Sequence, residues 1–461
     1  MQKPMQKLFK SPDTFFKYLT ALVLMAIVLY PKFPFIRIPG VQVSIRLEDF
    51  LMASLGLLLG IYLLAAAKKV LSFKIERAIV VYLAVGLVSL LSAIFLTQTV
   101  DPQVGVLHLL RRVEYFVPFL LGVVAIRRRE NLEFYIKVLM VSLLVVFVYG
   151  LGQRYFSWPI IVTQNVEYSK GIALRWTAGS HVNSSFAGHY DLATFLVLIL
   201  PTLISLIFLL KDLKTKIVLT VLSMGSLWLL SAAVSRISIV SYLLGTSFAL
   251  LLLKKYKALV LVMIVSVVFF SFSADLLARY TRVIEVFLQK AQIQSHDIAL
   301  SRVEVFAQEQ DLSVKRVRLT PTPTPEPVFE DRSSSIRLNV EWPRAIRAFS
   351  KNPLLGTGYS SITLATDNDY LRALGEVGLL GFTAFLLIFL RIGSVLLTKI
   401  RSVRQMEPVQ AGFTAGIAGA LLGVLLNAVF IDVFEASKFA IIFWLFMGIA
   451  VGLLRNQTYV E

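Results

Sequence analysis

The sequence contains no cysteine and only four histidines, and charged residues make up just 16% of its 461 positions. Without cysteine the chain cannot form a disulfide scaffold, an iron–sulfur cluster or a thiolate zinc site. Acidic residues are also scarce: 28 of them face 46 lysines and arginines, which gives a net charge of +18. The hydrophobic share is 57%, above the roughly 45–50% typical of soluble domains. The composition therefore predicts an integral membrane protein.

Long apolar runs occupy most of the chain, and a helix that crosses the hydrocarbon core needs about 20 mostly apolar residues. The hydropathy predicts an all-α, polytopic fold with about twelve transmembrane helices, at residues 16–31, 48–67, 78–96, 106–126, 133–151, 190–210, 216–233, 238–253, 258–275, 375–397, 411–431 and 438–454. We expect an N-terminal transmembrane bundle over 1–275 with about nine helices. A large outer loop module over 276–374 then separates it from about three C-terminal transmembrane helices over 375–461.

Lysine and arginine concentrate in alternate short loops, namely Lys68–Arg77, Arg127–Arg129, Lys211–Lys216, Lys254–Lys257 and Lys399–Arg404. The positive-inside rule then predicts that both termini are cytoplasmic. The net charge is explained by these loops lying beside anionic lipid, so we do not expect nucleic-acid binding. The first apolar segment follows several lysines and lacks a small-x-small cleavage site, which predicts an uncleaved helix.

Three polar segments, 32–47, 152–189 and 276–374, then lie on the outer side. Apolar residues recur at helical spacing over 276–288, a pattern suited to the membrane surface. The alternating prolines of "TPTPTPEP", residues 320–327, favour an extended spacer. Farther on, a helix is expected around 338–349, with Leu338, Trp342, Ala345, Ile346 and Phe349 on one face and Arg337, Glu341 and Arg344 on another.

The distribution of polar residues separates the function classes. Ion-coupled transporters place ionisable residues near the bilayer midplane, often on broken helices. In this sequence the middles of the predicted spans are nearly free of charge, and polar residues gather at outer helix ends and outer loops. An enzyme acting at the outer face fits that distribution better than a pump.

One cluster stands out at the end of the large loop. "NPLLGTGYSS", residues 352–361, has glycines that permit a tight backbone path, and "TDNDYLRALGEVGLLG" follows at 366–381. Asp367, Asn368 and Asp369 could act there as helix caps and complement the helix dipole. Capping accounts for any one of the three but poorly for the whole combination with Tyr370 and Arg372.

These residues resemble the C-terminal signature of the O-antigen ligase and O-antigen polymerase family of bacterial membrane glycosyltransferases. In that family a P-x-x-G-x-G stretch on the outer loop precedes H-N-x-(Y/F)-L-x-x-x-x-E-x-G-x-x-G, and Tyr370, Leu371, Glu376, Gly378 and Gly381 fall in register. "LRWTAGS" (174–180) and "AAVSRISIV" (232–240) are similar to two further family stretches, the second to a short S-x-S-R loop. The resemblance extends over about residues 170–382.

The resemblance implies transfer of a glycan from an undecaprenyl-diphosphate-linked donor to a glycan, lipid or protein acceptor, without cofactor or nucleotide sugar. The acceptor hydroxyl attacks the anomeric carbon, and the lipid diphosphate departs. Asp367 aligns with the family histidine, so Asp367, or Asp369 beside it, is expected to take that role. Asn368 and Tyr370 adjoin these carboxylates and are candidate substrate-binding residues.

Arginine suits the diphosphate because its planar fork stays charged and can bind two phosphate oxygens. Arg236, between two apolar spans on the outer side, is the leading candidate, and snorkelling or pairing with an acid is the alternative. Arg175, Arg337, Arg111 and Arg112 are further candidates, and for the last two an internal ion pair is equally compatible.

His181 and His189 flank "VNSSFAG" and are candidates for hydrogen bonds to a sugar or acceptor; a metal site would need more ligands.

The sequence thus predicts a glycan ligase or polymerase of the bacterial cytoplasmic (inner) membrane, with its active site on the outer side. An exporter or flippase of lipid-linked oligosaccharide is the main alternative, which internal repeats and a central cationic cavity would indicate. A non-catalytic scaffold that binds cell-wall glycan is another. Ligase and polymerase share the signature and stay unseparated.

Overall fold

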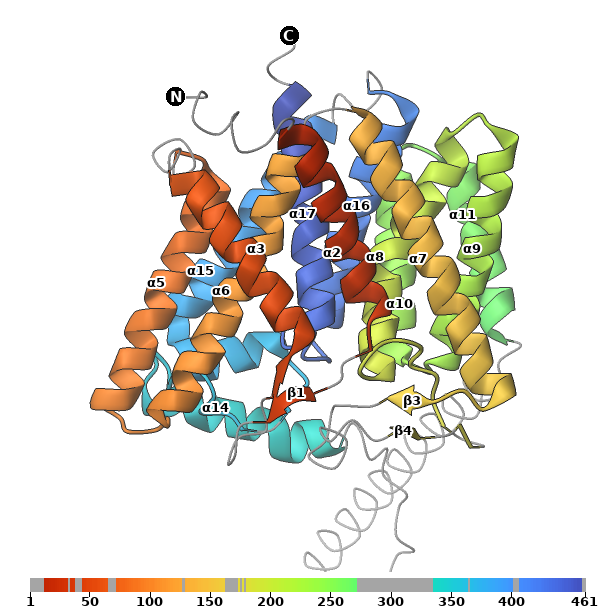
Figure 1. Ribbon diagram of the computed structural model, residues 1–461. Helices are drawn as coiled ribbons and strands as arrows, with labels where there is room; N and C mark the ends of the chain where they lie inside the picture. The colour runs from red at the N-terminus through yellow and green to blue at the C-terminus, as the bar shows by residue number, and fades with distance from the viewer. Residues whose placement is uncertain are drawn as a thin grey trace, which may run out of the picture.

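The protein is a bundle of long helices (Figure 1). The computed structural model describes residues 12–31, 34–37, 44–64, 72–126, 129–161, 173–174, 176–177, 180–271, 335–363, 365–400 and 406–457. Its helices are α2 (Pro12–Leu29), α3 (Leu47–Leu64), α5 (Lys74–Phe95), α6 (Pro102–Ala125), α7 (Arg129–Phe156), α8 (His189–Leu209), α9 (Leu213–Ala232), α10 (Arg236–Leu252), α11 (Tyr256–Ser271), η2 (Arg337–Glu341), α14 (Trp342–Lys351), α15 (Asp369–Ile400), α16 (Pro408–Asn427) and α17 (Ser437–Gln457).

Seven of the described helices are long and apolar enough to cross a membrane, namely α5, α7, α8, α9, α15, α16 and α17. The remaining predicted spans fall on α2, α3, α6, α10 and α11, of which α10 and α11 are apolar but shorter, at 17 and 16 residues. The chain is therefore a mostly helical integral membrane protein. Twelve crossings, and a separate loop module over 276–374, stay predictions.

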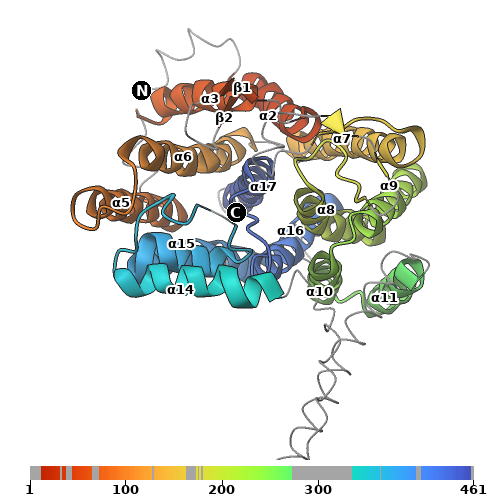
Figure 2. The same cartoon turned by 90° about the horizontal axis from the view of Figure 1, so that it is seen from below.

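Helix α17 lies at the centre of the bundle (Figure 2), and its apolar stretch within Ser437–Arg455 is entirely buried. Around it, α6 packs directly on α17, α16 packs on α8 and α10, and α15 packs on α5. Close approach requires small residues where α10 meets α16, because a Cβ added to Gly245 would lie 2.6 Å from the Gly419 carbonyl oxygen. Small residues of this kind let membrane helices pack backbone to backbone.

One end of the bundle carries α14, the loop 428–436 between α16 and α17, and two short antiparallel strand pairs (Figure 1). The strands β1 (Pro34–Arg37) and β2 (Ser44–Arg46) form one pair, and β3 (Ile160–Ile161) and β4 (Ala173–Leu174) form the other. These strands correct the all-α expectation for the fold and lie in the segments 32–47 and 152–189, which were predicted as outer polar segments. We call this end the site end, and α2 begins and α17 ends at the opposite one.

Helix α15 is broken at Gly378, which has φ 65° and ψ −170°, a conformation that glycine alone adopts readily. Backbone groups freed by the break bond instead to residues 353–358. Thr357 and Gly358 donate to the carbonyls of Gly375 and Glu376 at 2.9 and 2.8 Å, and Leu379 and Leu380 donate to those of Pro353 and Leu354 at 2.8 and 3.2 Å. The glycine-rich loop predicted from the sequence thus completes the broken helix.

The helix expected around 338–349 is present as η2 followed by α14. Its apolar face is only partly covered, since Ala345 is buried but Leu338 and Ile346 are 57% and 51% exposed. The predicted stripe at 276–288, the proline segment at 320–327 and Arg175 lie outside the described residues.

Candidate functional site

Arg337 and Asp367 form an ion pair at the site end. Arg337 Nε donates to Asp367 Oδ2 at 2.9 Å, and Nη2 lies 2.8 Å from the same oxygen. Tyr190 of α8 lies beside the same guanidinium. Asp367 itself has φ 48°, a left-handed conformation that Asp tolerates better than most residues. Burial raises the pKa of the Asp367 carboxyl, and Arg337 opposes that shift. The structure therefore brings together two of the predicted site residues.

Asp432, in the loop 428–436, holds the segment around Asp367 in place. Its carboxylate accepts hydrogen bonds from the backbone N–H groups of Thr366 and Asn368 at 2.8 and 3.0 Å. It also pairs with Arg372 Nη2 at 3.0 Å. The Asp432 carboxylate thus binds the N–H groups on both sides of Asp367 as well as the Arg372 guanidinium. These contacts fix the backbone of the turn at Asp367.

The next three residues make contacts within the protein. Asn368 caps α15, because its Oδ1 accepts from the Leu371 N–H at 2.9 Å. The buried Asp369 carboxylate accepts from the backbone N–H of Val433 at 2.8 Å and of Phe434 at 3.3 Å. The Tyr370 hydroxyl donates to the Leu425 carbonyl at 2.7 Å. Asp369 thus ties α15 to the loop 428–436, which points to a supporting role.

Changing Asp369 to Asn should lower the free energy of unfolding by about 1–3 kcal/mol, because an amide replaces an oxygen that accepts backbone hydrogen bonds in a buried position. Thermal denaturation in detergent measures the effect. Asp212→Asn is a suitable control, since Asp212 caps α9 at the opposite end and Asn caps helices equally well. Equal melting temperatures for the Asp369→Asn variant and the wild type would contradict this assignment.

A second layer of charges lies deeper in the bundle. Arg112 of α6 pairs with Glu435 and donates to the Phe434 carbonyl at 3.2 Å, and its guanidinium lies over the Tyr359 ring. Arg372 lies between Asp432 and Glu376, the latter at 3.4 Å. Burial alone would raise the pKa of Glu435, but the two guanidinium groups lower it to about 2. For Arg112, the structure thus shows the internal ion pair that the sequence left open.

Arg236 is the first residue of α10 and lies at the same end as Asp367. Two residues on, Ser238 bonds to Ser235 at 2.7 Å and to Asn427 Oδ1 at 3.1 Å. The carbonyl of Ala428, next to Asn427, accepts from the Asp369 N–H at 3.0 Å. Contacts therefore lead continuously from the start of α10 to the start of α15.

The remaining candidates lie around this centre. Arg111 pairs with Asp49 of α3 at 3.8 Å. The His181 and His189 rings are 4.5 Å apart because residues 181–188 turn back instead of forming a helix. Within the described part of the chain, no three His, Cys, Asp or Glu residues gather as metal ligands would.

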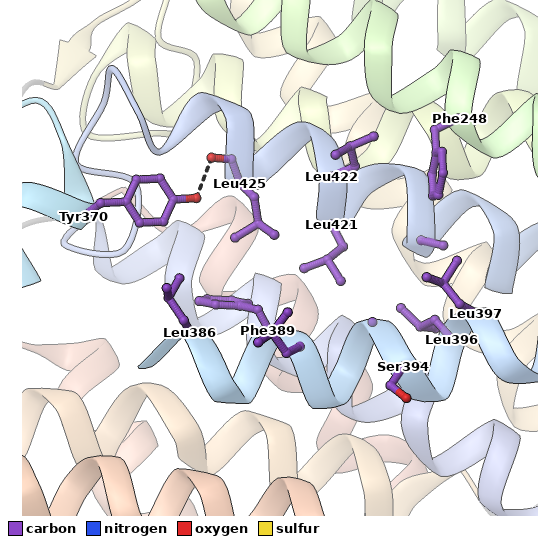
Figure 3. A pocket seen from close by; sticks show the side chains of 13 residues that line it. Phe248, Tyr370, Leu386, Phe389, Ser394, Leu396, Leu397, Leu421, Leu422 and Leu425 are labelled. Atoms are coloured by element: carbon purple, nitrogen blue, oxygen red, sulfur yellow. Dashed lines mark hydrogen bonds between the residues drawn. The ribbon is translucent and has the colours of Figure 1, made fainter. Parts of the chain in front are cut away.

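Two grooves flank the bundle. One, of about 470 Å³, lies between α10, α15 and α16 and is lined almost wholly by apolar side chains, from Tyr370 near the Asp367 turn to Leu397 (Figure 3). The second, of about 460 Å³, lies between α3 and α6 and includes Arg111 and Glu114. The first groove starts beside the site and runs away from it along α15.

Sequence reasoning missed Asp432 and Glu435, although both face the arginines of the signature. They lie in the short link between the predicted spans 411–431 and 438–454. A signal was present, because "IDVFE" at 431–435 places two acids in a short link between strongly apolar helices. Such charges are expensive near a membrane unless paired.

Comparison with known families agrees with the signature. Residues 218–386 match the family model described as O-antigen ligase, a range that contains Arg236, Arg337 and Asp367 but ends before Asp432. No curated protein matches the chain. The resemblance found in the sequence is thus confirmed by an O-antigen ligase match over residues 218–386.

Proposed function

We propose that this protein is a glycosyltransferase of the O-antigen ligase or polymerase type. It transfers a glycan from an undecaprenyl-diphosphate donor to an acceptor at the outer face of the cytoplasmic membrane. The observation that carries the proposal is the O-antigen ligase match over 218–386, which includes Arg236, Arg337 and Asp367. Lipid-linked glycan substrates follow from that family.

The charge distribution supports an outward-facing site end. Lys211 and Lys254 lie in the turns between α8 and α9 and between α10 and α11, and Lys216 lies near the start of α9, all at the end opposite the Asp367 turn. Because basic loops stay in the cytoplasm, the site end faces outward and both termini face inward.

The apolar groove between α10, α15 and α16 suits the polyprenyl tail of the donor. Its lining, which includes Phe248, Phe389 and Leu421, carries no acidic or basic side chain (Figure 3). Each buried CH₂ group contributes about 0.8 kcal/mol relative to water. A tail in this groove would bring its diphosphate to the Tyr370 end, next to the Asp367 turn.

Arg236 and Arg337 are the proposed contacts for the diphosphate. Among the described residues, Arg337 forms an ion pair with Asp367 alone, whereas Arg112 contacts two carboxylates and Arg372 three. We assign Arg372 and Arg112 to holding the loop 428–436. Fixed cations stabilise the negative charge that develops as the sugar–phosphate bond breaks.

Reconstitution tests the proposal directly. Proteoliposomes that contain the protein and lipid-linked glycan extracted from the host envelope should release undecaprenyl diphosphate and form a larger glycan product. Mass spectrometry of the lipid fraction measures the release, and protein-free liposomes are the control. Donor that moves between leaflets without cleavage would instead favour the exporter, and a requirement for nucleotide sugar would exclude the proposed donor.

A further inference from the structure

Unpaired polar atoms cluster where η2 joins α14. Among the described residues, Glu341 Oε2, Trp342 Nε1 and Arg344 Nη1 are buried and have no hydrogen-bond partner. Buried polar atoms in folded proteins are nearly always paired, so each exception calls for a functional or solvent partner. One acceptor and two donors within four residues match the alternating hydrogen-bonding groups of a sugar.

The local backbone explains why these side chains face the site. Residues 337–341 form a π-helical turn, in which the Trp342 N–H donates to the Arg337 carbonyl five residues back. Such turns are rare and occur often at functional sites. The wider turn places Arg337 and Glu341 near the same carboxylate, since both interact electrostatically with Asp367. The Trp342 ring lies 6.0 Å from Phe430 of the loop 428–436.

Glu341 differs from the other carboxylates around it. Asp367 accepts a hydrogen bond from Arg337 Nε and pairs with its Nη2. Asp432 binds two backbone N–H groups and Arg372. A proton transferred to either would weaken those bonds. Glu341 differs because its Oε2 atom is buried and has no hydrogen-bond partner among the described residues.

We propose that Glu341 is the general base of the transfer reaction and that Trp342 and Arg344 hydrogen-bond the acceptor sugar beside it. This assignment rests on the proposed function. The acceptor O–H bond breaks as its oxygen bonds to the anomeric carbon of the donor. The proton passes to the Glu341 carboxylate, and the bond from the anomeric carbon to the diphosphate oxygen breaks with its electron pair leaving on undecaprenyl diphosphate. Asp367 positions Arg337 and the acceptor.

The charges around Glu341 favour this role. They are the carboxylates of Asp367 and Asp432, on two separate loops, and the guanidinium groups of Arg337 and Arg344 on its own helix. Burial and the two carboxylates raise the pKa of Glu341 to about 7, and the arginines oppose them. A base is most effective when its pKa lies near the working pH.

Glu341→Gln should reduce turnover in the reconstituted assay about 10²-fold, the lower range for general-base catalysis. The pH profile of the wild type should fall below about pH 7, where Glu341 becomes protonated. The Glu341→Asp variant should keep a titrating limb, whereas Asp367→Asn should lose activity but retain the limb near pH 7. Trp342→Phe should raise the KM for acceptor a few-fold and leave kcat near the wild-type value.

Glu130→Gln, an exposed change at the opposite end, is the matched control. Turnover of Glu341→Gln within a few-fold of the wild type would overturn the assignment, and so would a loss of activity that leaves the acidic limb in place. If Glu341→Gln does not fold, the Glu341→Asp variant replaces it. A pH–activity profile of Glu341→Asp without the acidic limb would then overturn the assignment. Failure of the proposed function is distinct, because the wild type itself would then release no undecaprenyl diphosphate.

Discussion

Gly378→Ala should leave little or no folded protein in the membrane. The backbone at this residue, with φ 65° and ψ −170°, excludes side chains, and an added Cβ would lie 2.5 Å from the Gly356 nitrogen and closer still to the Leu354 carbonyl oxygen. Strain and overpacking together cost about 3–6 kcal/mol. Because the clashing atoms are backbone, they cannot move without breaking the bonds that join residues 353–358 to α15.

Fluorescence-detected size-exclusion chromatography and thermal melting of detergent-solubilised protein would measure the loss. Gly393→Ala is the matched control: it changes the same helix, and an added Cβ would have no atom within 4 Å. Alanine there should be neutral or stabilise by about 0.5–1 kcal/mol. A Gly378→Ala variant that melts with the Gly393→Ala protein would show that the break in α15 is not required.

Arg236→Ala should reduce glycan transfer about 10³-fold while the protein accumulates normally. The leaving diphosphate gains negative charge in the transition state, and a fixed guanidinium at such a site contributes about that factor. Arg236 begins α10 and is only partly exposed, so alanine removes its charge without opening a deep cavity. Release of undecaprenyl diphosphate from proteoliposomes measures turnover.

Two comparisons sharpen this test. Arg236→Lys should recover only part of the activity, because lysine keeps the charge but cannot bind two phosphate oxygens in one plane. Arg77→Ala, at the opposite end, should transfer normally, since Arg77 bonds to the Ser72 carbonyl far from the site. Wild-type turnover in Arg236→Ala would remove this residue from the mechanism.

Local patterns predicted the helices well. Each predicted span overlaps a helix, because long apolar runs bounded by basic loops have few alternatives in a membrane. The glycine turn at 356–358 and its position before α15 were also expected. The break at Gly378 was not, since "EVGLLG" is compatible with an unbroken helix and only the contact with residues 353–358 makes the break stable.

The candidate site was predicted in part. The signature identified Asp367, and arginine chemistry identified Arg337, but their ion pair joins residues 30 positions apart. Asp432 and Glu435 come from a third segment, which only folding places opposite Arg372 and Arg112. Glu341 looked like one polar position on an amphipathic helix until the π-helical turn and the unpaired Oε2 atom set it apart.

The four backbone hydrogen bonds between residues 353–358 and the two halves of α15 affect how segments of related proteins can be exchanged. A chimaera that exchanges the external segment alone, with its junction before Asp369, would separate residues 353–358 from the α15 residues to which they hydrogen-bond. Each unpaired amide in a lipid environment costs several kcal/mol. To transfer substrate specificity between relatives, the exchanged segment should therefore be longer and should end beyond Leu380.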